Sequence, residues 1–69
     1  MTLLEIFKIE REVAEDPPLP GLTVRRITAS NPDHIWLVLE WPQGGKTRSQ
    51  EVREFYNYHD WKLGVKSQA

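Results

Sequence analysis

The sequence predicts an α+β fold, in which a three-stranded antiparallel meander is accompanied by an N-terminal helix and a C-terminal helix. Apolar residues follow helical spacing near the start of the chain and again after residue 50, and three strand-like runs between turn signals separate them. With 69 residues, the chain is expected to form one small domain, 1–69, with a frayed tail at 65–69. A small all-β barrel is the alternative.

The N-terminal helix is predicted over residues 3–15. Thr2 and Glu5 have the spacing of a capping box, in which a hydroxyl residue and a Glu three positions later each bind the other's backbone N–H. Two prolines follow Asp16, and a proline disfavours helical geometry in the residue before it. A strand over the same stretch remains open, because 7–13 also shows partial alternation.

The central strand is expected at about 35–41, within the longest nearly uninterrupted apolar run of the chain. Side chains alternate along a strand, so four residues should share the face toward the core. These four are Ile35, Leu37, Leu39 and Trp41. Trp36 and Val38 then lie on the opposite face. If both helices cover one face only, Trp36 is expected to be exposed and to mark a partner surface.

The remaining elements follow from turn chemistry and composition. A β-branched strand is expected at 22–29, a turn at 30–33, a hairpin loop at 42–45 and a polar edge strand at 46–52. The C-terminal helix is expected from about residue 50 or 51 to Trp61, with Gly64 as a possible C-terminal cap. Because 50–61 also fits a continuing strand, both alternatives stay open at this point.

Composition excludes several classes of protein. The chain has no cysteine, which excludes disulfides and thiolate metal sites. Its net charge of −1 gives no global attraction to nucleic acid or to anionic lipid. No apolar segment is long enough for a membrane span, and no basic region opens the chain as in a secretory signal. We therefore expect a cytoplasmic protein that does not bind membranes.

No motif in the sequence predicts catalysis, a metal or a cofactor. Gly44-Gly45-Lys46-Thr47 is similar to the end of a phosphate-binding loop, but Glu40 stands where that motif needs another glycine. A hairpin turn is the simpler interpretation. His34 and His59 each adjoin an aspartate, yet neither has a nucleophile or a metal-ligand partner at a suitable spacing. We predict that the protein is not an enzyme.

The surplus of aromatic residues predicts an interaction surface, because Trp, Tyr and Arg are the residue types that dominate binding energy at protein interfaces. The predicted partner-binding residues are Trp36, Tyr56, Tyr58 and Trp61, with Arg25 and Arg26 at the rim. The function that follows is a small non-enzymatic accessory or regulatory subunit, which binds another protein or a second copy of itself.

The order helix–strand–strand–strand–helix resembles the double-stranded-RNA-binding domain over the whole chain. Asn31-Pro32-Asp33-His34 stands where that family has a turn containing Pro and His between its first two strands. The resemblance implies nucleic-acid binding as the alternative function. The basic residues of the first and third predicted strands would then contact phosphates: Arg25, Arg26, Lys46 and Arg48. The family's lysine-rich start of the last helix corresponds here to the acidic stretch 49–54. The alternative barrel resembles the SH3 fold.

Overall fold

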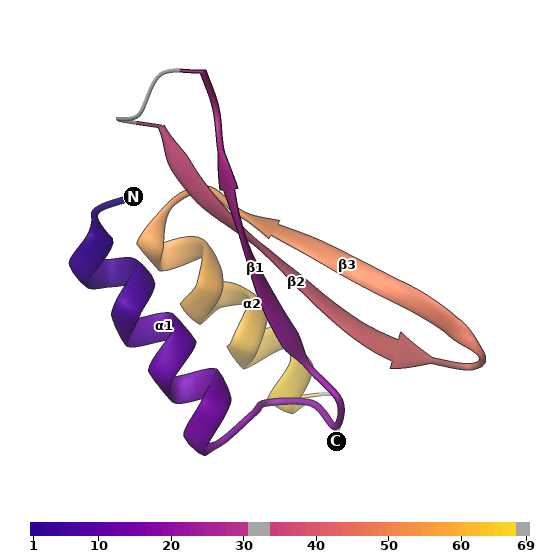
Figure 1. Cartoon of the computed structure of the whole chain (residues 1–69). Helices are drawn as coiled ribbons and strands as arrows, with labels where there is room; N and C mark the ends of the chain where they lie inside the picture. Colours follow the sequence, from indigo (N-terminus) through magenta and orange to yellow (C-terminus); the bar gives the residue numbers. More distant parts are fainter. Residues whose placement is uncertain (31–33, 68–69) are drawn as a thin grey trace.

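The computed structural model of the chain describes residues 1–30 and 34–67 and contains two helices and three strands (Figure 1). In chain order the elements are α1 (Leu3–Glu15), β1 (Thr23–Thr28), β2 (Ile35–Gln43), β3 (Lys46–Val52) and α2 (Phe55–Ser67). Their type and order are those that the sequence predicts, so the α+β fold is confirmed and the barrel is excluded. Most of the predicted turn, 31–33, lies outside the described residues.

Helix α1 begins with the predicted capping box. The Thr2 hydroxyl accepts the backbone N–H of Glu5 at 3.2 Å, and the Glu5 carboxylate accepts the backbone N–H of Thr2 at 2.9 Å. The two bonds satisfy donors that a helix start otherwise leaves without partners. The buried residues of α1 recur at helical spacing and are Ile6, Ile9 and Val13. This settles the choice between helix and strand for the stretch 7–13.

The three strands form an antiparallel meander in the order β1-β2-β3. The register is continuous, with Leu37 opposite Arg26 of β1 and opposite Val52 of β3. The β2–β3 hairpin closes through Gly44 and Gly45, whose φ angles are +60° and +78°. Two consecutive residues with positive φ make the tight turn that suits the twist of a hairpin. The turn is shorter than predicted, because residues 42 and 43 continue β2.

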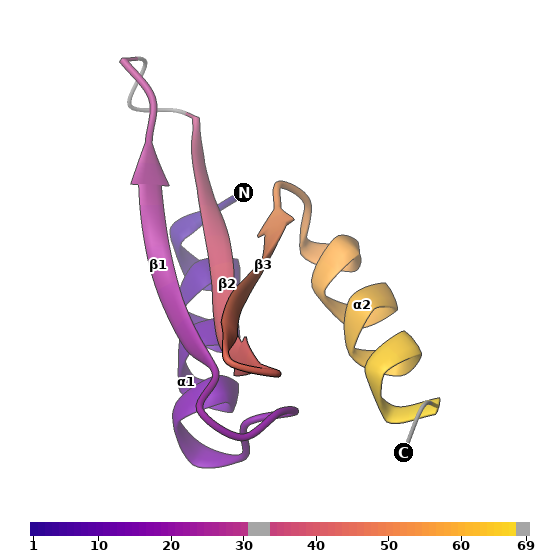
Figure 2. The same ribbon diagram turned by 90° about the vertical axis from the view of Figure 1, so that its right-hand side faces the viewer.

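Both helices lie on the same face of the sheet (Figure 1, Figure 2). The face of β2 predicted to point inward is confirmed, since Leu37 and Leu39 are fully buried and both flanking residues, Ile35 and Trp41, pack against the core. Buried side chains from α1, from the segment before β1, from β3 and from α2 complete this one core: Ile6, Ile9, Val13, Leu22, Val52 and Tyr58. Val24 of β1 is partly buried against it. The chain is therefore a single domain with a core on one side of its sheet.

Helix α2 differs from the prediction at both of its ends. Residues 50–52 belong to β3, where Gln50 and Val52 lie opposite Leu39 and Leu37 of β2. The helix begins only at Phe55 and continues to Ser67, past the predicted end at Trp61. The spacing of apolar residues after residue 50 fits both a strand and a helix. Pairing with β2 therefore decides where β3 ends and where α2 can begin.

The C-terminal part of the prediction also needs correction. Gly64 lies inside α2 and does not cap it. The described glycines with positive φ are Gly21, Gly44 and Gly45, so Gly64 does not have the left-handed conformation of a typical C-terminal cap. Residues 65–67, predicted as part of a frayed tail, belong to the helix, while 68–69 lie outside the described residues. The Ser67 hydroxyl donates a hydrogen bond to the Gly64 carbonyl at 2.9 Å, which satisfies one acceptor of the last turn.

Two charge pairs hold α1 to its neighbours. Arg26 of β1 donates two hydrogen bonds of 2.7 Å to the Glu10 carboxylate, and this pair lowers the pKa of Glu10 below its ordinary value. Lys62 of α2 donates to the Glu12 carboxylate. Burial raises the pKa of Glu12, but the hydrogen bond and the charge of Lys62 outweigh this effect, so the pKa is lowered as well.

The one-sided core predicts a large difference between two leucine truncations. Leu37→Ala is expected to lower the free energy of unfolding by about 2–5 kcal/mol, because it leaves a cavity at a fully buried site. Leu63→Ala is the matched control, since Leu63 is 66% exposed, and it should change stability by less than about 0.5 kcal/mol. Urea unfolding followed by circular dichroism measures both. Equal losses would contradict the assignment of the core to this face.

The two charge pairs predict a loss of stability in acid. A carboxyl group whose pKa is lower in the folded state stabilises the fold above its unfolded pKa, and the contribution disappears as pH falls through the folded pKa. The melting temperature should therefore decline as pH drops below about 4.5, the ordinary value for Glu10 and Glu12. Glu10→Gln should flatten this decline in thermal melts. Glu54→Gln is the control, because Glu54 forms no salt bridge among the described residues, and it should leave the decline in place.

Candidate binding groove

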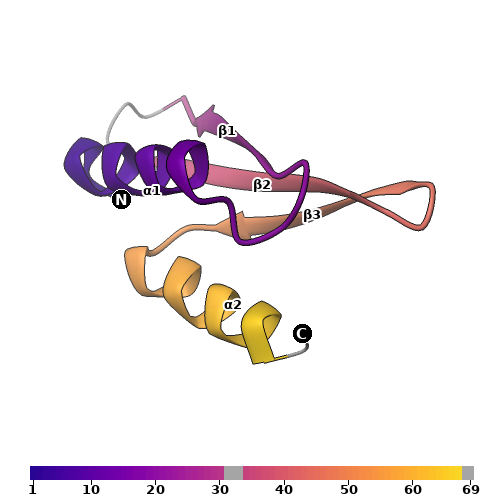
Figure 3. The ribbon, with the colours of Figure 1, turned by 90° about the horizontal axis from the view of Figure 1, so that it is seen from below.

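A groove runs between β3 and α2. It consists of two open hollows of about 580 and 390 Å³, which share Gln50 and Trp61 in their walls. Its two walls are neighbouring elements, since α2 lies beyond β3 on the side away from β2 (Figure 2, Figure 3). We call this the β3–α2 groove, and its lining is Trp41, Gln43, Arg48, Ser49, Gln50, Glu51, Arg53, Asn57, Asp60, Trp61, Gly64 and Val65.

The helical wall of the groove is one face of α2. Its residues recur at spacings of three and four, which places them on one side of a helix: Asn57, Asp60, Trp61, Gly64 and Val65. Trp61 packs on Trp41 of β2, with ring centroids 5.4 Å apart, and this pair forms an apolar floor. A Cβ added at Gly64 would meet no atom within 4 Å, so the groove is open at this position.

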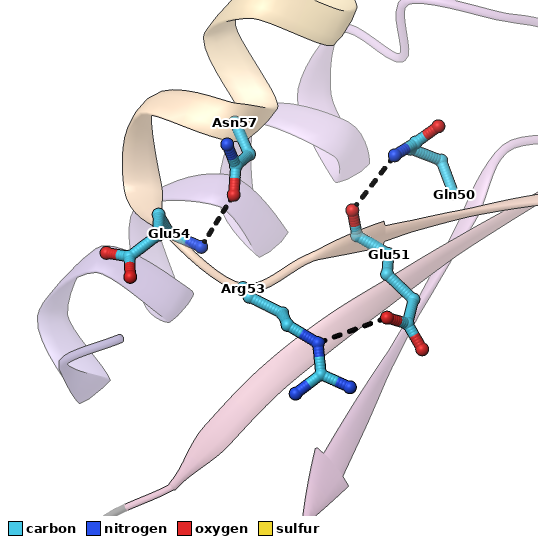
Figure 4. Close-up of polar contacts among 5 residues, drawn as sticks. All are labelled: Gln50, Glu51, Arg53, Glu54 and Asn57. Atoms are coloured by element: carbon cyan, nitrogen blue, oxygen red, sulfur yellow. Dashed lines mark hydrogen bonds and ion pairs between the residues drawn. The ribbon is translucent and has the colours of Figure 1, made fainter.

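The other wall is the free edge of the sheet. Among the described strands, β3 pairs only with β2, so alternate backbone N–H and C=O groups along its outer side face away from the sheet. Gln43 and Lys46 close the two-residue turn as a hydrogen-bonded pair, so the alternation of an antiparallel ladder leaves the backbone of Glu51 facing away from β2. The Glu51 carbonyl accepts a hydrogen bond from the Gln50 side chain there at 3.1 Å (Figure 4). Because backbone directions alternate along a strand, the N–H and C=O of Ser49 point outward too.

Hydrogen bonds at the start of α2 order the residues that line the first hollow. Asn57 Oδ1 accepts the backbone N–H of Glu54 at 3.0 Å, and the Arg53 guanidinium pairs with the Glu51 carboxylate at 3.1 Å (Figure 4). The first bond fixes the start of the helix as a cap does. The second pairs the Glu51 charge with a positive one. Asp60, the other acidic residue of this hollow, forms no salt bridge among the described residues.

The second hollow, on the hairpin side of the groove, is basic, whereas the first hollow carries the negative charge of Asp60. Arg48 lines this second hollow, and Lys46 is the first residue of β3, directly after the two glycines of the turn. Both side chains are exposed, and neither forms a salt bridge among the residues that the structure describes. Lys46 and Arg48 occupy the face of β3 that bears Val52, the face toward the helices, because all three are separated by even numbers of positions.

The predicted aromatic residues of α2 do not share one surface. Only Trp61 lines the groove. Tyr58, predicted as a surface residue, is 0% exposed and belongs to the core, and burial together with the charge of Glu12 raises the pKa of its hydroxyl. Tyr56 is 62% exposed but does not line the groove. One turn of α2 therefore carries aromatic residues that point in different directions, which composition alone does not reveal.

Trp36 lies on the face of the sheet opposite the helices, as expected, but it is not fully exposed. The Arg53 guanidinium lies 4.3 Å from the centroid of its ring, a cation–π contact, and the residue is partly buried. The indole Nε1 is buried and has no hydrogen-bond partner within the described parts of the chain. This cover makes Trp36 a weaker candidate for a partner surface than the sequence suggests.

The two arginines predicted at the rim do not lie together. Arg25 pairs with Glu40 on the outer face of the sheet at 3.2 Å, whereas Arg26 is held by Glu10 on the helix side. With Lys46 and Arg48 near the hairpin, the four basic residues proposed as phosphate contacts occupy both faces of the sheet. No continuous basic surface results from them, so no observation in the structure favours nucleic-acid binding.

His59 lies among the aromatic rings of α2. The His59 ring packs edge-on against Phe55 and Tyr58, with centroid distances of 4.8 and 5.6 Å. Within residues 1–30 and 34–67, no three side chains of the kinds that hold metals lie close enough to bind an ion. In the same residues, no helix combines the length and the apolar character required to cross a membrane.

Most of the groove residues were not predicted as functional. Gln50, Asn57, Asp60 and Gly64 carry no recognisable motif, and their common feature is that one helix face and one strand edge lie opposite each other. Gly64 is the signal that could have marked the site. A glycine inside a helix lowers helix stability, so one that does not cap the helix often has a packing or functional reason. Comparisons with protein-family models, with curated proteins and with solved structures gave no match.

Two glycine-to-alanine variants test this description of the backbone. Gly64→Ala should raise the free energy of unfolding by about 0.5–1 kcal/mol, because alanine favours a helix interior and its Cβ meets no atom. Gly21→Ala should lower it by at least about 1 kcal/mol, since Gly21 has a φ of +74° and a Cβ there would lie 2.9 Å from Pro42. Thermal unfolding compares them. A loss of stability in Gly64→Ala would show that the groove is filled at this point.

Proposed function

We propose that this chain is a small, non-enzymatic interaction module, which binds an extended segment of another protein in the β3–α2 groove. In this mode the segment adds a strand to the free edge of β3 and places alternate side chains against α2. The observation that carries the proposal is the juxtaposition of an unpaired strand edge and an open, Trp-lined helix face. Addition of a strand beside a helix is a recurring way to recognise peptides.

Main-chain hydrogen bonds supply one part of the proposed interaction. The outward-pointing backbone groups of Ser49 and Glu51 can pair with an incoming strand, which would lie about 4.8 Å from β3. In the structure the Gln50 side chain donates a hydrogen bond to the Glu51 carbonyl. It is exposed and flexible enough to rotate away, so a backbone donor of the segment can replace it without disturbing the core.

Side chains supply the other part. Trp41 and Trp61 are partly buried and pack on the core, so their positions are fixed before a partner arrives. A rigid aromatic floor loses little conformational entropy on binding, which is one reason why Trp contributes strongly to interfaces. The opening at Gly64 leaves room above this floor for an apolar side chain of the segment.

The proposal predicts that Gly64→Arg abolishes peptide binding. A library of random linear peptides displayed on phage is selected on the immobilised protein, and the enriched peptides are then measured by fluorescence anisotropy. Arginine at position 64 fills the open point of the groove and should weaken binding at least about tenfold, while the helix is retained. Gly64→Ala is the matched control and should bind as the natural sequence does.

Two further readouts distinguish groove binding from non-specific adhesion. Bound peptide should slow hydrogen exchange at the amides of Ser49 and Glu51, as strand addition requires. Leu4→Gln removes a large exposed apolar side chain on α1, and it should leave binding unchanged. Selected peptides that bind equally to Gly64→Arg, or a selection that enriches no peptide, would contradict the proposed function.

A further inference from the structure

We infer that the segment bound in the β3–α2 groove has a fixed charge order, with a basic side chain before a central apolar residue and an acidic side chain after it. This inference rests on the proposed function and specifies the partner, because the two ends of the groove carry opposite charges. Asp60 lines the first hollow together with Glu51, Arg53 and Asn57, and Arg48 lines the second hollow, which reaches toward the hairpin.

The charges at the two ends are available to a partner. Glu51 is already paired with Arg53, so Asp60 is the uncompensated charge of the first hollow among the described residues. In the second hollow Arg48 has no acidic partner among them, and Lys46 adds a second positive charge nearby. A segment with a basic side chain near Asp60 and an acidic one near Arg48 complements both ends at once.

An apolar side chain fits between these ends. Gln50 and Trp61 belong to both hollows, so they mark the middle of the groove. Trp41 and Val65 adjoin this point, and Gly64 leaves the space above them open. A branched or aromatic side chain of the segment would cover the exposed parts of both Trp rings, which favours binding through loss of apolar surface.

The direction of the segment follows from the sheet. Every strand pair in the described structure is antiparallel, and antiparallel pairing is slightly more stable per residue than parallel pairing. A segment antiparallel to β3 starts beside Glu51 and ends beside Lys46. The basic residue therefore comes first in its sequence, the apolar residue is central, and the acidic residue comes last.

Two biased peptide libraries test this order. Both have a fixed central leucine among threonines, and one carries Lys before and Glu after it, whereas the other carries Glu before and Lys after it. We expect the first library to be enriched, and peptides from it to bind about three- to tenfold more tightly than their charge-exchanged isomers at low salt. The preference should shrink as salt concentration rises, because the groove is open to solvent.

A charge-exchanged protein provides the matched control. The double variant Arg48→Glu with Asp60→Lys should reverse the preference and favour the second library, while its circular dichroism spectrum stays unchanged because both side chains are exposed. Reversal in this variant would support the inference. A general preference for one peptide charge would stay the same when the charges at positions 48 and 60 are exchanged.

The outcomes separate the two proposals. If both libraries yield peptides that Gly64→Arg rejects but neither charge order is preferred, the inference is wrong and the proposed function stands. If neither library yields such a peptide, both are wrong. A dimer of the protein that Gly64→Arg dissociates, measured by analytical ultracentrifugation, would place a second copy in the groove and overturn the inference.

Discussion

The packing of both helices on one face of a three-stranded sheet is the constraint on which the rest of the structure depends. Leu37 and Leu39 of the central strand are fully buried, and the helices have to cover them from the same side. Helix α1 is tied to β1 through Glu10 and Arg26. Since packed helix axes lie about 8–10 Å apart and strands about 4.8 Å apart, α2 is displaced past β3. Helix α2 therefore lies past the edge of β3 (Figure 3), and the β3–α2 groove lies between the two elements.

The free edge of β3 is a liability that this arrangement partly controls. An unprotected edge strand invites pairing with any extended chain, and charged residues and nearby helices are common protections. Here Lys46 and Arg48 are exposed on the strand, and α2 restricts access from one side. These same features would make the edge selective, because a segment that pairs with β3 must also fit the wall of α2 and its charges.

Local signals predicted the elements well and the residues of the β3–α2 groove poorly. The capping box of Thr2 and Glu5 and the alternation along β2 depend on a few neighbouring residues, so they can be recognised in a sequence. The start of α2 could not, because residues 50–52 become a strand only through pairing with β2. Tyr58 and Trp61 are one helical turn apart, yet one is core and the other lines the groove.

The sequence by itself determined the capping box of α1, the inward face of β2 and the glycine turn of the hairpin, and it favoured the order of elements that the structure confirms. Each of these follows from backbone conformation, capping or periodicity within a short stretch. Only the tertiary structure decided where α2 lies, which aromatic side chains are buried and which charges are paired. The lateral position of a helix depends on contacts with strands distant in sequence, and that position places Asp60, Trp61 and Gly64 opposite the edge of β3.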